Sequence, residues 1–137
     1  MKLDSSAFIA APELIQALEK SAYPVVCGGD RLLFKQGDTP VGLYILNAGA
    51  ATLTMAAPGG GQITEIQAPA GSLLGLPGLL GNQPYTLSAT AHAGARLGFV
   101  PRDELTKLMQ ADPQLSLKML QVLAAEVSSA RRALCEL

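Results

Sequence analysis

Histidine, cysteine and charged side chains are all scarce in this chain of 137 residues. The only histidine is His92, so the chain lacks the imidazole cluster that a metal-dependent cupin enzyme requires. Cys27 and Cys135 are too few for a disulfide scaffold and show no CxxC spacing, which predicts free thiols. No carboxylate pair is placed for acid–base chemistry, since the isolated aspartates fit turns and helix caps. We therefore expect no metal, no cofactor and no enzymatic activity.

Charged residues make up only 15% of the chain, against 49% hydrophobic residues, and the net charge is −1. This leaves little polar covering for the surface of a monomer and predicts a partner surface. No basic run is long enough to follow a phosphate backbone, so we expect no direct nucleic acid binding by this chain. Glycine and proline break the apolar runs well before the roughly 18 residues of a membrane span. Asp4 and Pro12 interrupt any signal peptide, so we expect a cytoplasmic protein without membrane contact.

Three segments with different patterns follow one another, and the length suits a single domain over residues 1–137. Ser5 and Ser6 are candidate caps of an amphipathic N-terminal helix over about 6–20. Between about 22 and 101, runs of four to seven apolar or β-branched residues alternate with glycine-rich turns. Many short strands joined by turns predict a β-sandwich or a β-roll.

Alternation of apolar and polar residues marks several of these strands, such as Leu53 and Met55 against Thr52 and Thr54. Over 62–67, however, Ile63 and Ile66 are out of phase with each other. Either a β-bulge or a strand covered on both faces explains this phase. The run over 58–61, PGGG, is predicted to be a hairpin turn and not a phosphate loop, because no GK[ST] follows it.

Helical periodicity returns after Pro101 and predicts two C-terminal helices, over about 103–110 and 113–137, capped by Asp103 and Asp112. Apolar residues of the last helix are spaced 3, 4, 3, 4, 3, which is the seam of a coiled coil: Leu120, Leu123, Val127, Ala130, Leu134 and Leu137. Leu115, Met119 and Val122 form a second, offset stripe.

Two partners are possible for this seam. In a homodimer the seam faces a second chain while the offset stripe packs on the roll, and Glu126 and Arg131 occupy positions that pair across a parallel dimer. Alternatively, the seam covers the roll of its own chain. Arg131 and Arg132 suit the end of a helix and solvent, although they are also a candidate site for an acidic partner or nucleic acid.

Two segments, LFKQGD over 33–38 and LYILNAG over 43–49, resemble the paired strand signature of the cyclic-nucleotide-binding domain in the catabolite-activator (Crp/Fnr) family. The glycine-rich hairpin and the VPRD segment over 100–103 before the last helices also match that family. The resemblance extends over nearly the whole chain. It implies a mainly β fold: a double-stranded β-helix, or jelly roll, with flanking helices and a long C-terminal dimerisation helix.

The resemblance places the family's phosphate-binding cassette at residues 75–89. In members that bind nucleotides, a Gly-Glu pair opens the cassette, an Arg-Ser/Thr-Ala sequence closes it, and the two charged side chains contact ribose and phosphate. Here Gly75 and Thr86 match, whereas Leu76 replaces the glutamate, Tyr85 the arginine and Leu87 the alanine. Losing one partner of a buried charged pair costs roughly 2–5 kcal/mol. We therefore expect weak or no binding of cyclic AMP and cyclic GMP.

The tentative ligand site consists of cassette residues: Gly75, Leu76, Pro77, Gly78, Tyr85, Thr86 and Leu87. Tyr85 has two interpretations, an apolar plug of the phosphate site, which the neighbouring leucines favour, or a contact to a different effector.

The expected function is that of a non-enzymatic regulatory module with a small-molecule effector or a protein partner. One alternative is a nucleotide sensor that uses Thr86 and backbone groups. Another is the effector domain of a transcription regulator whose helix-turn-helix domain lies outside this sequence.

Overall fold

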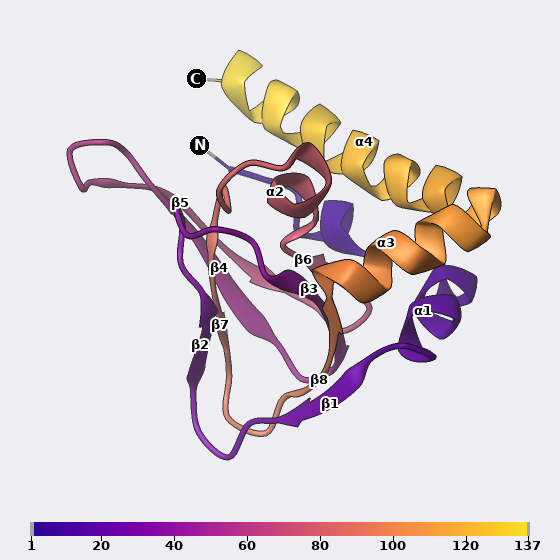
Figure 1. Ribbon diagram of the computed structural model, residues 1–137. Helices are drawn as coiled ribbons and strands as arrows, with labels where there is room; N and C mark the ends of the chain where they lie inside the picture. The colour runs from indigo at the N-terminus through magenta and orange to yellow at the C-terminus, as the bar shows by residue number, and fades with distance from the viewer. Residues whose placement is uncertain (1, 137) are drawn as a thin grey trace.

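The computed structural model describes residues 2–136 and has two four-stranded antiparallel sheets with helices on one side (Figure 1). The first sheet has the order β1-β8-β3-β6 and the second β2-β7-β4-β5. The strands are β1 (Tyr23–Val26), β2 (Arg31–Phe34), β3 (Gly42–Ala48), β4 (Ala51–Ala56), β5 (Gln62–Ala68), β6 (Leu73–Leu74), β7 (Ser88–Ala91) and β8 (Arg96–Pro101). The helices are the 3-10 turn η1 (Ser5–Phe8) and α1 (Pro12–Glu19), α2 (Leu76–Gly81), α3 (Arg102–Ala111) and α4 (Pro113–Cys135). This is the expected mainly β jelly roll with a long C-terminal helix.

Two apolar cores share the first sheet, which lies between them. Leu46 contributes to the core between the two sheets, together with Leu53, Ile66 and Phe34. Leu43 and Ile45 lie in the second core, which the sheet forms with α1, α3 and α4. Successive side chains of a strand point to opposite faces, so burial of both sets makes β3 the central strand of the molecule.

The N-terminal helix predicted over about 6–20 is wrong, because two elements replace it. The Asp4 carboxylate accepts a hydrogen bond from Ser6 N (3.0 Å) and caps η1, not Ser5 or Ser6. The chain is then extended, with Ile9 bridging to Ser72, and α1 begins only at Pro12. A residue before proline is disfavoured in helical conformation, and Ala11 accordingly has ψ 144°.

The phase shift over 62–67 is a β-bulge. Met55 pairs with Thr64 and Ala56 with Gln62, so the ladder between β4 and β5 passes over Ile63, which is 39% exposed. The bulge lies beside the predicted PGGG turn, in which Gly60 has φ 94° and Ala57 N donates to Gly61 O (2.7 Å).

The two C-terminal helices follow the prediction closely, with one difference in capping. Asp112 caps α4 by accepting hydrogen bonds from Gln114 N and Leu115 N. Asp103 does not cap α3, which begins one residue earlier, at Arg102. Arg102 N donates to Val41 O (3.1 Å), and this backbone bond replaces a side-chain cap.

Helix α4 packs on its own chain, against η1, α1 and α3, through the offset stripe and not through the predicted seam. The stripe of Leu115, Met119 and Val122 is buried, and it continues along the helix into Glu126, Ser129 and Ala133. Leu120, Val127 and Leu134 of the seam are exposed, at 53%, 44% and 58%, while Leu123 and Ala130 are half-buried. The alternative in which the seam covers the roll is therefore wrong. Leu137 lies outside the described residues.

Candidate functional site

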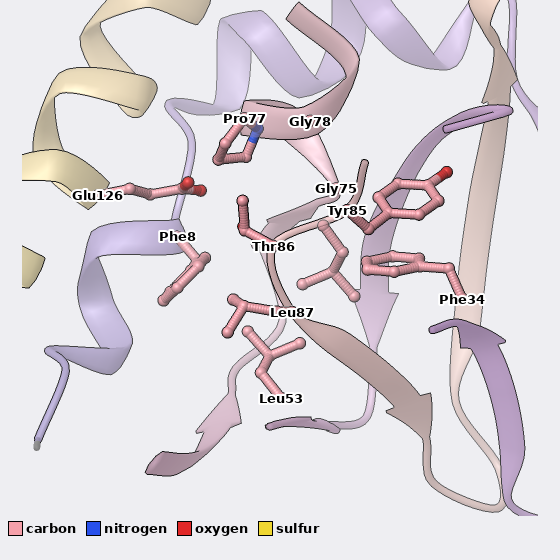
Figure 2. A pocket seen from close by; sticks show the side chains of 11 residues that line it. Phe8, Phe34, Leu53, Gly75, Pro77, Gly78, Tyr85, Thr86, Leu87 and Glu126 are labelled. Carbon is pink, nitrogen blue, oxygen red and sulfur yellow. The ribbon is translucent and has the colours of Figure 1, made fainter. Parts of the chain in front are cut away.

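Helix α2 and the segment after it line a small pocket between the roll and α4 (Figure 2). Six of the seven predicted ligand residues lie on its wall: Gly75, Pro77, Gly78, Tyr85, Thr86 and Leu87. Leu76 does not, because its fully buried side chain belongs to the core beneath the helices. The sequence prediction missed the other five lining residues: Phe8, Phe34, Leu53, Leu74 and Glu126.

Tyr85 is buried in the wall of the pocket, and both its ring and its hydroxyl contact other residues of the chain. Its ring stacks on Phe34, with the centroids 4.0 Å apart and the planes inclined by 19°. Its hydroxyl donates to Gly42 O (3.0 Å) and accepts from Val41 N (3.1 Å). The hydroxyl donor and one acceptor position of Tyr85 are therefore engaged with the backbone at the start of β3.

The backbone of Tyr85 joins the cassette to the Gly-Asp turn. Gly37 N donates to Tyr85 O, and Tyr85 N donates to Asp38 O, both at 2.9 Å. A glycine is required at position 75, where φ is 96° and a Cβ atom would lie 2.9 Å from the tyrosine ring. These contacts connect the cassette to the first of the two segments that resemble the family signature.

Thr86 and Pro77 lie near the mouth of the pocket. Thr86 is exposed, and Figure 2 shows its side chain between Pro77 and Phe8. Pro77 is in the first turn of α2 and has no N–H, so this turn offers one donor fewer to a ligand. The enclosed cavity has a volume of about 20 Å³, roughly the space of one water molecule.

Glu126 of α4 is the only carboxylic acid among the lining residues, and no basic side chain lines the pocket. It is 9% exposed and Figure 2 shows its carboxyl group directed toward the space between Pro77, Thr86 and Phe8. Oε1 is buried without a hydrogen-bond partner, and burial raises the pKa of Glu126 to about 8. The predicted pairing of Glu126 with Arg131 across a dimer is therefore wrong.

The signal that would have located Glu126 is the spacing of the offset stripe. Leu115, Met119 and Val122 are separated by four and three residues, and four more residues lead to Glu126. The sequence prediction placed Glu126 beside the coiled-coil seam instead of extending the offset stripe to it.

Stability should fall as the pH rises, because the folded state holds a proton on Glu126 that the unfolded chain has lost. Its folded pKa of about 8 exceeds the ordinary 4.5, so the stabilisation is complete below about pH 4.5 and is lost as the pH rises to about 8. We expect the free energy of unfolding to fall by about 3–5 kcal/mol across this range, measured in urea. Glu126→Gln should abolish most of this dependence.

The matched control is Glu13→Gln, which neutralises an exposed carboxylate on α1. It should leave the pH dependence of the wild type in place. A free energy of unfolding that does not change with pH in the wild type, or that changes equally in the wild type and Glu126→Gln, would contradict the raised pKa of buried Glu126.

The described part of the chain, residues 2–136, contains no helix long and apolar enough to cross a membrane. Nor do these residues gather three or more histidine, cysteine or acidic side chains into a metal-binding group. Cys27 is buried and Cys135 exposed, and both are free thiols.

Comparison with solved structures finds similar folds among bacterial regulators. The catabolite activator protein of Thermus thermophilus superposes with a TM-score of 0.78 at 24% identity, over 90% of this chain and 58% of that one. The sensor domain of the transcriptional regulator DNR from Pseudomonas aeruginosa has a TM-score of 0.64 at 20% sequence identity, over 83% of this chain and 77% of that one. The N-terminal domain of a transcriptional regulator from Streptomyces coelicolor has a TM-score of 0.66 at 22% sequence identity, over 90% of this chain and 87% of that one. The chain thus spans little more than half of the Thermus protein's length.

A search of curated proteins finds no match. The family model of the cyclic nucleotide-binding domain, in contrast, matches residues 26–112. These residues include both strand segments that carry the resemblance and the whole cassette. By this match the chain belongs to the cyclic nucleotide-binding domain family, and the resemblance is confirmed at that level.

Proposed function

We propose that this chain is a non-enzymatic regulatory module whose pocket does not bind cyclic AMP or cyclic GMP tightly. The observation that carries the proposal is Tyr85, which fills the arginine position and directs its hydroxyl to Gly42 O. No cationic side chain lines the pocket to balance a phosphate. The relatives are named as an activator and as transcriptional regulators, which supports a regulatory role.

The cavity also disfavours a nucleotide in this conformation. Its volume of about 20 Å³ compares with the roughly 300–1,000 Å³ of pockets that hold small molecules. Leu76 is fully buried, so a carboxylate at this position would lie in the core and not near a ribose. Tyr85 accordingly acts as the plug of the former phosphate site.

Titration calorimetry with cyclic AMP, cyclic GMP and cyclic di-GMP tests this proposal. We expect no saturable heat at micromolar protein and no rise in melting temperature, whereas a ligand at 100 times its Kd stabilises a protein by about 2.7 kcal/mol. Micromolar or tighter binding of one nucleotide would overturn the proposal. Loss of that affinity in Thr86→Ala would then support the alternative of a nucleotide sensor that uses this hydroxyl.

We further propose that α4 joins two copies of the chain in a homodimer. The supporting observation is a row of exposed apolar side chains at coiled-coil spacing: Leu120, Val127 and Leu134, with Leu123 and Ala130 beside them. The opposite side of the helix is already buried against the roll. Exposed apolar rows of this kind are typical of protein interfaces.

Leu134→Glu should convert the dimer into a monomer, because it places a charge in the seam of each helix. Sedimentation velocity or native mass measurement would show the change. Ser128→Glu is the matched control, since it adds the same charge at an exposed position of α4 outside the seam. A dimer that survives Leu134→Glu would contradict the proposed interface.

A second candidate function is the effector domain of a transcription regulator. The observation that favours it is the similarity to a sensor domain and to an N-terminal domain of such regulators. In that case, a signal at the pocket would pass through α4 to a DNA-binding domain outside this sequence, either on the same polypeptide or on another one. A helix-turn-helix encoded directly beyond Leu137 would support this candidate, and a stop codon there would exclude a domain on the same polypeptide.

A further inference from the structure

The pocket beneath α4 is lined by one carboxylic acid and no basic side chain, whereas a phosphate site requires a basic one. We propose that it binds the ammonium group of a small primary amine, which donates to the Glu126 carboxylate while its apolar chain leaves past Thr86. This inference rests on the proposed function, because it assigns a ligand class to the same pocket.

Glu126 is the first reason for this assignment. Among residues 2–136, its Oε1 is the one buried side-chain nitrogen or oxygen without a hydrogen-bond partner. A buried polar atom of this kind costs free energy unless a donor reaches it. The carboxyl group that carries this atom is directed toward the pocket (Figure 2), so a ligand there can supply the donor that the fold does not.

The other lining groups favour a cation over an anion. No lysine, arginine or histidine lines the pocket, and the Tyr85 hydroxyl is engaged with Gly42 O and Val41 N. The aromatic rings of Phe8 and Phe34 form part of the same wall. Because the Phe34 ring is stacked on Tyr85, these rings supply apolar surface to the pocket, which cannot balance the charge of an anion.

The size and shape of the pocket narrow the class to a primary amine. A volume of about 20 Å³ holds one group of about the size of a water molecule. An ammonium group has about this size. A single carboxylate supplies at most two oxygen ligands, whereas a divalent cation such as Ca²⁺ or Mg²⁺ is coordinated by about six oxygen atoms. Apolar side chains at the wall, Leu53 and Leu87 among them, suit a short alkyl chain that runs toward exposed Thr86.

Binding of the ammonium group should release a proton. The free pocket holds Glu126 protonated at neutral pH, since burial raises its pKa to about 8. The bound cation favours the carboxylate, so the carboxyl proton passes to the buffer as the ion pair forms. Tyr85 is the only other titratable side chain on the wall, and its hydroxyl contacts the β3 backbone and not the cavity.

The experiment is titration of the full chain with n-butylammonium chloride, followed by calorimetry and by backbone amide NMR. We expect saturable binding, with shifted signals at Glu126, Thr86 and Phe8, and weaker binding of n-butanol and butyrate. Glu126→Gln should bind at least about tenfold more weakly, while Glu13→Gln should match the wild type. In the wild type alone, heats measured in two buffers should report roughly one released proton per site at pH 7.

The absence of saturable butylammonium binding, equal affinity in Glu126→Gln, or tighter binding of butyrate would each overturn the inference. Binding without proton release would overturn it as well, even if Glu126→Gln fails to fold. None of these results touches the proposed function, which fails only if a cyclic nucleotide binds at micromolar concentration or below.

Discussion

The hydroxyl of Tyr85 is the contact on which the candidate site depends. It closes hydrogen bonds to Gly42 O and Val41 N, while the ring stacks on Phe34 and lies against Gly75. One side chain thus fixes the end of the cassette to the start of β3, the central strand. In nucleotide-binding members, the resemblance implies an arginine here that contacts the phosphate. In this chain the position holds a neutral phenol that is buried and bonded to its own backbone.

Three further features distinguish this pocket from a phosphate site. Leu76 lies in the core under the helices, Pro77 lacks a backbone donor, and no basic side chain lines the wall. The only carboxylic acid of the lining, Glu126, lies on α4. The same helix presents the exposed apolar row of the proposed interface on another face. A ligand bound to Glu126 would therefore contact the element that is proposed to join two chains.

Much of this could be predicted from the sequence, because local chemistry determines it. The PGGG turn, the Asp112 cap and the strand signature around Gly37 act over a few residues. The break between η1 and α1 was missed, since the pairing of Ile9 with Ser72 is a contact between distant segments. Glu126 was also misplaced, because heptad spacing shows which residues share a face but not which face meets the roll. The resemblance identifies the position of Tyr85, whereas the partners of its hydroxyl, Gly42 O and Val41 N, lie more than 40 residues away in the sequence and follow only from the fold.

The free energy of unfolding of Tyr85→Phe tests the central claim, that the tyrosine is a structural plug bonded to its own backbone. Loss of the hydroxyl leaves buried backbone groups of β3 unpaired, so we expect a decrease of about 1–3 kcal/mol in urea denaturation. Tyr44→Phe is the control, because it removes a half-buried hydroxyl for which the described residues show no hydrogen bond. We expect it to change stability by less than about 0.5 kcal/mol. Equal stability of Tyr85→Phe and the wild type would contradict the account.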